Sequence, residues 1–475
     1  MQGQTQPSVK PLRMPLAMSI ESRTASTAKD SRLVNSYVET LEDVQYVVKR
    51  PGTTSMTLAP TIANGAAQGL ISFNGKLYAG ISSKLYEITA AGATTDKGAT
   101  AAGHLSFSRT SQVPYLFLHN STAGWNLNGA TGTLTAITDL DFPPLQTPAL
   151  PLAHGAVYLD DMVFVMTTSG RIYNSALEDP TTWGALDYIS KISEPDGGVA
   201  LVKHLNFVVA FGSWSGEFFY NAGNSTGSPL DRSSSYKMDI GCAAGTSLIE
   251  FAQTAAWIGQ SRETGRGVYI LEGVSPVKIS TPAIERYLNA STLATVDAFA
   301  TTVAGHTFYC LTLNDLNITL VCDINEKRWY QWSTDSAGTD IMWKYYGITS
   351  LNGISYLQDR TTGQLSTFST SVYQDETANI NYRIVTYKID AKSHTRKFWQ
   401  HLEIIGDKAT ATLQVRHADD DYTTWTTYRN IDLSLERPIL RQLGSARRRV
   451  YDFFSTSNVA IRLQAAEILM KEGTF

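Results

Sequence analysis

The stretch GRIYNSALEDPTTWGALDYISKISEPDGGVALVKHLNFVVAFGSWSGEFFYNAG, residues 170–223, decides the fold. It contains short apolar runs, rich in β-branched and aromatic residues, at 199–202, 207–211 and 217–220. Ahead of these runs stands Glu194-Pro195-Asp196-Gly197. This is a turn sequence, because proline presets φ and glycine tolerates positive φ. Short runs separated by turns predict a meander of antiparallel strands.

Similar units recur along the chain. Besides the stretch above, they start near residues 69, 104, 155, 247, 297 and 345. Asn74-Gly75 and Asp160-Asp161 mark hairpin turns inside two of them. Spacings of roughly 35 to 50 residues are typical of propeller blades. The sequence therefore predicts an all-β protein with a β-propeller of six or seven blades at residues 31–378. N-terminal strands could complete the last blade and close the ring.

The two ends of the chain read differently from the repeated units. From residue 379 the strand signals become longer and alternate, so residues 379–475 predict a C-terminal β-sandwich that serves as a docking or platform domain. Residues 1–30 contain Pro7, Pro11 and Pro15 and predict an extended arm that orders on a partner. Helix is expected only near residues 283–288.

Composition limits the possible functions. Of the 475 residues 43% are hydrophobic, only 17% are charged, and the net charge is −4, which disfavours a nucleic-acid binder that works by bulk electrostatics. Three cysteines without a C-x-x-C motif argue against a disulfide framework and fit a reducing site of assembly. The longest apolar runs are too short for a membrane span, and the N-terminus lacks the apolar region of a signal peptide.

Two acidic segments are candidates for chemistry. Glu194 and Asp196 flank a proline and could act as an acid–base pair, but carboxylates in a turn usually cap the backbone. The segment Asp419–Trp425 resembles the Asp-box turn of sialidase-type propellers. It occurs once and lies outside the repeated units. Both segments are therefore interpreted as structural turns.

The remaining chemical motifs are weak. His417 with Asp420 and Asp421 has a metal-like spacing, but only on a helix, and these residues read as a turn. Cys310 and Cys322 stand in apolar strands and are interpreted as core residues. Gly265-Arg266-Gly267 precedes a strand and not a helix, so it is interpreted as a loop. We predict no cofactor, no metal, no catalytic residue and no enzymatic activity.

Basic residues gather in the C-terminal segment. Six of them form the candidate interface: Lys392, Arg396, Lys397, Arg447, Arg448 and Arg449. Three consecutive arginines on a strand would point to both faces, so at least one of them must be buried, paired or at an interface. Acidic residues are interspersed, which favours a protein partner over DNA phosphates, although both remain open.

The organising stretch also carries a family resemblance. Its blocks Ser175–Trp183, Glu194–Gly197 and Phe211–Ser213 resemble the packaged-DNA stabilisation proteins of short-tailed bacteriophages, also called tail-hub or nozzle proteins. Further blocks fit the same pattern in the same order: Arg32–Tyr37, Lys49–Gly52, Ile240–Ala244, Ile279–Glu285 and Leu443–Val450. Together they span most of the chain, from about residue 32 to residue 470.

The resemblance implies a virion structural protein of the phage tail, assembled in the host cytoplasm. It implies a homo-oligomeric ring, with six copies expected, that extends the DNA channel below the portal and adaptor and retains packaged DNA until ejection. The implied partners are the adaptor or head-to-tail connector and the tail needle, fibre or tailspike proteins, while DNA passes without specific binding. The alternative reading is a carbohydrate-active or glycan-binding, sialidase-like propeller.

Overall fold

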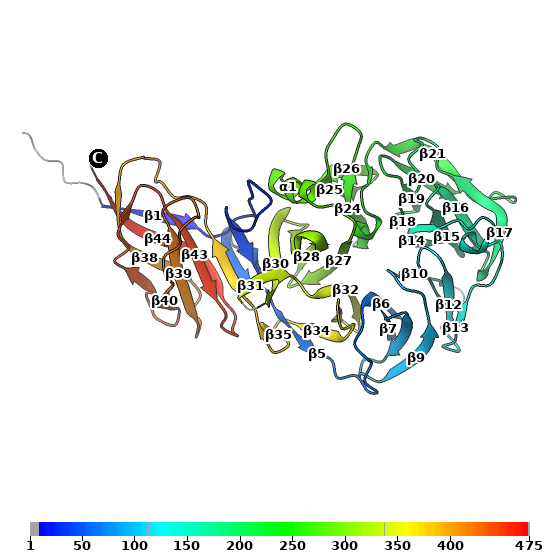
Figure 1. Ribbon diagram of the computed structural model, residues 1–475, viewed down its shortest axis with the longest axis horizontal. Helices are drawn as coiled ribbons and strands as arrows, with labels where there is room; N and C mark the ends of the chain where they lie inside the picture. The colour runs from blue at the N-terminus through cyan, green and yellow to red at the C-terminus, as the bar shows by residue number, and fades with distance from the viewer. Residues whose placement is uncertain (1–8, 112–113, 252, 337, 474–475) are drawn as a thin grey trace, which may run out of the picture.

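The computed structural model describes residues 9–111, 114–251, 253–336 and 338–473. Strands take 55% of the chain and helix 4%, so the all-β prediction is confirmed. Figure 1 shows a ring of small sheets around an axis, with a second body beside the ring that holds the C-terminal strands. Within these described ranges there is one α-helix, α1 (Pro282–Ala290), and it falls where the sequence predicted helix.

Each of the first four blades is a meander of four antiparallel strands formed by consecutive segments, and the third and fourth blades are joined into one sheet by a parallel bridge between His154 and Ala200. The first holds β6 (Ala67–Phe73), β7 (Lys76–Ile81), β8 (Lys84–Ile88) and β9 (Thr94–Ala99). The second holds β10 (Ser106–Arg109), β11 (Tyr115–His119), β12 (Gly124–Asn128) and β13 (Leu134–Ala136). The third holds β14 (Leu152–Leu159), β15 (Met162–Thr167), β16 (Arg171–Ala176) and β17 (Asp179–Ser190). The fourth holds β18 (Ala200–His204), β19 (Phe207–Phe211), β20 (Gly216–Asn221) and β21 (Leu230–Met238).

The next two sheets are variants of the same meander. The fifth holds β22 (Gly241–Cys242) and β23 (Ile249–Phe251), which both pair with β24 (Thr254–Gln260), followed by β25 (Gly267–Glu272) and β26 (Ser275–Lys278). The sixth holds β27 (Val296–Val303), β28 (His306–Leu313), β29 (Ile318–Asp323), β30 (Arg328–Ser336) and β31 (Thr339–Met342). Short 3₁₀ turns stand between strands at Pro143–Leu145, Gly245–Ser247 and Asn314–Leu316.

The seventh sheet closes the ring with a strand from the N-terminal part of the chain. Its first three strands are β32 (Tyr345–Leu351), β33 (Ile354–Asp359) and β34 (Leu365–Ser369). The fourth is β5 (Gly52–Ser55), which pairs antiparallel with β34. The two-residue strands β35 (Gln374–Asp375) and β36 (Ala378–Asn379) extend this sheet. The fold is therefore a seven-bladed β-propeller, closed by the N-terminal strand as the sequence allowed.

The predicted hairpin turns have the backbone that their residues favour. Asn74 (φ 46°) and Gly75 (φ 73°) connect β6 to β7, and Asp160 (φ 46°) and Asp161 (φ 63°) connect β14 to β15. Positive φ at both central residues matches the twist of a two-residue hairpin. Asn and Asp tolerate this conformation better than most residues, so the local sequence fixes these turns.

The C-terminal body is a sandwich of two sheets. One holds β1 (Val9–Pro15), β3 (Ser36–Leu41), β4 (Val44–Lys49), β38 (Lys397–Gly406), β41 (Ile439–Arg441), β42 (Ser445–Ala446) and β44 (Arg462–Glu472). The other holds β2 (Arg32–Val34), β37 (Tyr382–Val385), β39 (Thr412–Ala418), β40 (Arg429–Asp432) and β43 (Val450–Ser455). One core of buried apolar residues fills the space between the sheets.

The N-terminal segment differs from the predicted extended arm. Residues 9–15 form strand β1, which pairs along its whole length with the C-terminal strand β44. Strands β3 and β4 also join the sandwich, although residues 36–49 were assigned to the propeller. The physical reason is that an isolated strand leaves its backbone groups unpaired, and β44 offers an edge that sequence order does not reveal.

Strand β2 joins the sandwich to the propeller. It pairs in parallel with β30 of the sixth blade and antiparallel with β37 of the sandwich, so one sheet runs through both bodies. In Figure 1 the sandwich accordingly lies against the side of the ring that holds β30, β31 and β35. The sandwich core also includes Trp332 and Trp343 from the propeller side, so no apolar boundary separates the two bodies.

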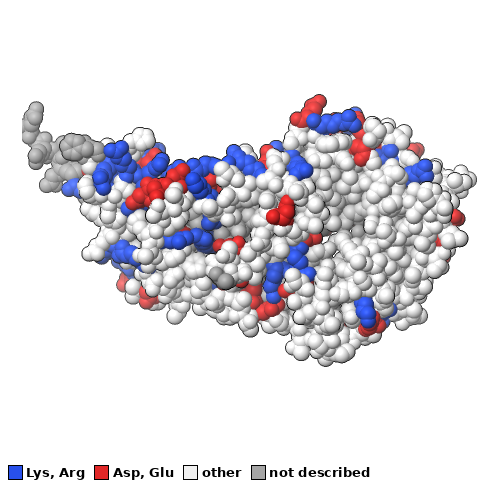
Figure 2. All heavy atoms as spheres, in the orientation of Figure 1, with Lys and Arg blue, Asp and Glu red and all other residues white. Residues whose placement is uncertain are grey.

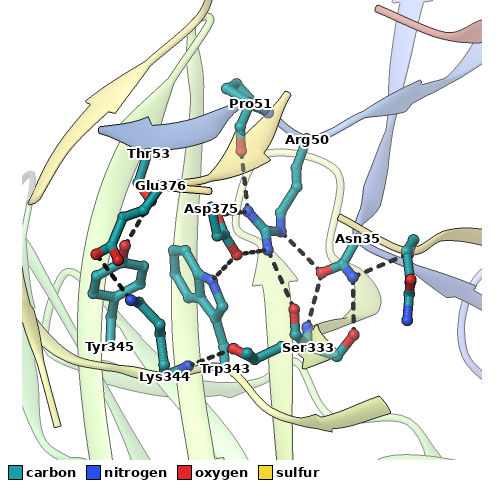
Figure 3. Close-up of polar contacts among 12 residues, drawn as sticks. Asn35, Arg50, Pro51, Thr53, Ser333, Trp343, Lys344, Tyr345, Asp375 and Glu376 are labelled. Atoms are coloured by element: carbon teal, nitrogen blue, oxygen red, sulfur yellow. Dashed lines mark hydrogen bonds and ion pairs between the residues drawn. The ribbon is translucent and has the colours of Figure 1, made fainter. Parts of the chain in front are cut away.

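A buried arginine fastens this junction, as Figure 3 shows. The Arg50 side chain has no exposed surface and forms an ion pair with Asp375, with an Nη2–Oδ2 distance of 2.5 Å and an Nη1–Oδ1 distance of 2.9 Å. Its Nε donates to the Asn35 side chain at 2.9 Å, and its guanidinium lies 5.0 Å from the Trp343 ring centroid. A buried charge is tolerated only when it is paired in this way. The Arg50 Nη2 also donates to the Ser333 carbonyl of β30 at 3.2 Å, so Arg50 connects the N-terminal segment, blade six and β35.

Candidate docking surface

The propeller axis is hollowed into a pocket of about 370 Å³. Every blade contributes a segment of its innermost strand to the lining. Among the lining residues only Lys203 and Glu250 carry a formal charge, and burial raises the pKa of the Glu250 carboxyl. Glycosidases commonly place one carboxylate on either side of the substrate bond, whereas the lining of this pocket contains one carboxylate, Glu250.

Two histidines of adjacent blades meet at this axis. The ring centroids of His104 and His154 are 4.8 Å apart, and His104 Nδ1 lies 2.6 Å from the Tyr346 hydroxyl of the seventh blade. Burial lowers the pKa of His104 to about 4 and that of His154 well below its usual value. Both rings are therefore neutral at pH 7, and they link blades seven, two and three without adding charge to the axis.

The carboxylates of the organising stretch have structural contacts. Asp196 is buried, forms an ion pair with Lys191, and accepts hydrogen bonds from the backbone N–H groups of Trp214 (2.7 Å) and Ser215 (2.9 Å). Glu194 is exposed and pairs with Arg262 at 3.2 Å. Asp196 thus fixes the following hairpin, whereas the sequence placed it in a solvated turn that caps itself.

The Asp-box segment is a turn on the sandwich. Asp420 accepts hydrogen bonds from the backbone of Thr423 (3.2 Å) and Thr424 (2.8 Å), and the Arg416 guanidinium lies 4.9 Å from the Trp425 ring centroid. Asp421 pairs with Arg23 and Lys388, and these two cations lower the pKa of its carboxyl. Throughout the described ranges no three His, Cys, Asp or Glu residues are grouped as metal ligands.

Burial and desolvation keep the histidine and cysteine candidates neutral. Burial beside Arg449 lowers the pKa of His417 to about 4. Cys242, Cys310 and Cys322 are free and buried, and burial raises the pKa of each thiol. Gly265 and Arg266 lie in the loop before β25, as the sequence indicated.

Two members of the predicted basic interface lie inside the sandwich. Arg449 is 2% exposed; its Nε and Nη2 donate to Asp419 at 2.7 and 2.8 Å, and its Nη1 donates to the Leu443 carbonyl at 2.6 Å. Lys397 is fully buried and donates to the backbone carbonyls of Ser393 and Arg447. Neither side chain is available to a partner in this conformation. Arg449 and Lys397 are therefore structural residues of the sandwich and are removed from the candidate interface.

The three arginines do not share a strand. Arg447 and Arg448 lie in a bend after β42, and Arg449 forms an isolated bridge with Ile389 just before β43. Three consecutive arginines point to alternate faces only on a regular strand, which is absent here, but one of them, Arg449, is buried and paired as expected. Arg447 and Arg448 are exposed because the bend turns the chain outward.

Three of the four exposed members, Arg396, Arg447 and Arg448, gather around one concavity, which we call the basic hollow. It encloses about 550 Å³ and is lined by Lys388, Asp390, His394, Arg396, Asp419, Ser445, Ala446, Arg447 and Arg448. Lys392 is exposed but does not line it. Segments 388–396 and 445–448 are far apart in sequence and meet here because β42 pairs with the start of β38. The structure thus unites Arg396, Arg447 and Arg448, adds Lys388 and His394, and leaves Lys392 outside.

Comparison with known proteins identifies the family. The family model described as bacteriophage P22 Gp10, β-propeller, matches residues 29–373. The chain belongs to this family. The matched range covers the closing strand β5 and all seven blades, and it ends just before β35. The resemblance stated from the sequence blocks is therefore confirmed, and the protein is a member of a phage packaged-DNA stabilisation family.

Other comparisons give only distant likenesses. No curated protein matches the sequence. Among solved structures, BamB from Moraxella catarrhalis is 12% identical with a TM-score of 0.37, over 76% of this chain and 100% of that one. The Pan2 WD40 domain of Neurospora crassa is 10% identical with a TM-score of 0.41, over 70% and 98%. In the described residues no helix is long and apolar enough to cross a membrane.

Proposed function

We propose that the protein is a non-enzymatic structural component of a phage tail, a hub or nozzle that helps to retain packaged DNA until ejection. The observation that carries the proposal is the family match over residues 29–373. We propose that the protein lies below the portal and adaptor in the phage tail. The proposed partners are the head-to-tail connector and the tail needle, fibre or tailspike proteins.

The size of the propeller pocket supports a ring of several copies as the DNA conduit. A cavity of about 370 Å³ has the volume of a sphere about 9 Å across, so it cannot admit duplex DNA, whose major groove alone is about 12 Å wide. The width of a channel along the symmetry axis of a homo-oligomer is not limited by the size of this pocket. We propose a ring, with six copies as the resemblance implies, in which each propeller is a solid body and not a pore.

The charge distribution supports a conduit that does not hold DNA tightly. Residues 67–369, which contain six complete blades and the first three strands of the seventh, hold 17 Lys and Arg against 25 Asp and Glu. A ring surface built from this part is acidic on balance, and phosphates bind tightly only where cations accumulate. We propose that DNA passes without specific binding.

The proposal is tested in two steps. Electron microscopy of the purified protein, alone and mixed with tail components, is expected to show rings with an open axis that seat on the connector. Particles assembled without this protein are expected to lose their DNA, and particles assembled with the protein supplied in trans are expected to keep it. Monomers that never join tail particles, or particles that keep their DNA without the protein, would refute the function.

A further inference from the structure

The basic hollow contains three guanidinium groups that form no ion pair with a carboxylate of the described residues. Arg396, Arg447 and Arg448 are exposed, and no carboxylate of the described residues lies within 4.0 Å of their side-chain nitrogens. Arg396 Nε is oriented by a 3.0 Å hydrogen bond to the Ser445 hydroxyl. The carboxylates nearby are already engaged, because Asp419 binds Arg449 and Asp390 Oδ1 accepts from the backbone N–H of Lys392 at 2.9 Å. The hollow therefore presents guanidinium charge that an anionic ligand can bind.

The volume of the hollow indicates the size of its ligand. About 550 Å³ falls within the range of roughly 300–1,000 Å³ in which proteins hold compact ligands. Arginine forks bind carboxylates and phosphates bidentately, and their planar geometry selects oriented oxygen pairs. Both an acidic polypeptide and a nucleic-acid backbone have such oxygens.

The lining of the hollow favours a polypeptide. Asp390 and Asp419 are part of the same wall, and a uniformly anionic backbone would have to pass them. A polypeptide with a few spaced carboxylates can place each one at an arginine and keep neutral residues beside the aspartates. Phe398 lies opposite Ser445 in the strand register and is 49% exposed, which adds an apolar contact of the kind that protein interfaces use.

We propose that the basic hollow is a docking site for an acidic segment of a partner protein, whose Asp or Glu side chains are held by Arg396, Arg447 and Arg448. The inference deepens the proposed function, since it says how the sandwich attaches to another tail protein. It also narrows the sequence prediction from six residues to three. Lys397 and Arg449 support the wall from inside the sandwich, and Lys392 stands outside it.

The test uses the purified full-length chain and a fluorescein-labelled synthetic peptide of alternating Glu and Ser. Fluorescence anisotropy is expected to show binding to the parent protein and a loss of at least about tenfold in affinity with Arg447→Glu plus Arg448→Glu. Arg396→Gln tests the third arginine separately. Lys392→Glu is the matched control, since it changes charge just outside the hollow, and it is expected to bind as the parent does. Circular dichroism checks that each variant is folded.

Several results would overturn the inference. These are no binding by the parent, equal binding by the folded Arg447→Glu plus Arg448→Glu variant, or an equal loss with Lys392→Glu. A duplex DNA probe that binds more tightly than the peptide, and is lost with the same two substitutions, would show a phosphate site instead. The peptide assay uses no phage particle. A negative result would therefore refute the docking site alone, and the proposed function would still be tested separately by particle assembly and DNA retention.

Discussion

The propeller and the sandwich are built by different chain topologies. Strands of blades one to six pair mainly with their neighbours in sequence, whereas in the sandwich β1 and β4 both pair with the C-terminal strand β44. Their charges differ as well. Residues 67–369 hold 17 basic and 25 acidic residues, and the remaining residues hold 22 and 18.

The surface shows the same contrast. In Figure 2 the visible face of the ring carries few charged side chains, while Lys, Arg, Asp and Glu crowd the sandwich and its junction with the ring. The comparison teaches that the locally paired propeller is weakly charged, whereas the sandwich, which is built from both ends of the chain, carries the higher density of charge. Because the ends are held by non-local pairing, the two bodies should unfold together, and the predictions below test this.

The largest effect is expected at the junction. Arg50→Ala leaves Asp375 buried without its partner, which typically costs about 3–5 kcal/mol. Urea unfolding followed by circular dichroism is expected to show this loss and to keep a single transition. Arg50→Met combined with Asp375→Leu removes both charges and should recover part of the stability. A cost below about 1 kcal/mol, or separate transitions for the two bodies, would contradict the coupling.

The axial histidines should make the propeller sensitive to acid. The pKa of His104 is lowered to about 4 in the folded protein, so its stabilising effect is complete above the unfolded value near 6.5 and is lost as pH falls toward 4. The loss is up to about 3 kcal/mol. His104→Gln is expected to flatten the stability profile between these pH values. Identical profiles for parent and His104→Gln would refute this role.

Ring closure depends on a glycine in β5. A Cβ at Gly52 would lie 2.0 Å from the Gln374 carbonyl oxygen, a backbone atom that can move only with β35. Gly52→Ala is therefore expected to lower the free energy of unfolding by about 1–3 kcal/mol. Gly347→Ala is the control in the same blade, because nothing lies within 4 Å of its added Cβ. Equal stability of the two variants would show that closure tolerates a shift of β5.

The smallest effect is expected at an exposed ion pair of the sandwich. Arg437 is 65% exposed and binds Glu403 bidentately, with an Nη2–Oε2 distance of 2.6 Å. Solvent and salt screen such a pair, so Arg437→Ala should leave the urea midpoint unchanged within error. A loss comparable to that of Arg50→Ala would mean that surface charge, and not the buried junction, holds the sandwich.

The sequence predicted best where structure is local. The Asn74-Gly75 turn, the short helix near residues 283–288 and the meanders follow from residue types a few positions apart. The sequence predicted the candidate site in part. It included the exposed Arg396, Arg447 and Arg448, but it gave no sign that Lys397 and Arg449 are buried. Burial of those two depends on Ser393, Leu443 and Asp419, which approach only when β38, β42 and β43 assemble.

The sequence by itself determined the all-β class, the repeated blades and the family, because strand periodicity, turn chemistry and residue order are written in consecutive positions. Only the tertiary structure decided that there are seven blades, that residues 9–15 and 36–49 belong to the sandwich, and that Arg50 pairs with Asp375. These features join segments up to about 450 residues apart, as β1 with β44. No local pattern specifies which edge a strand will meet, since every edge offers the same backbone groups.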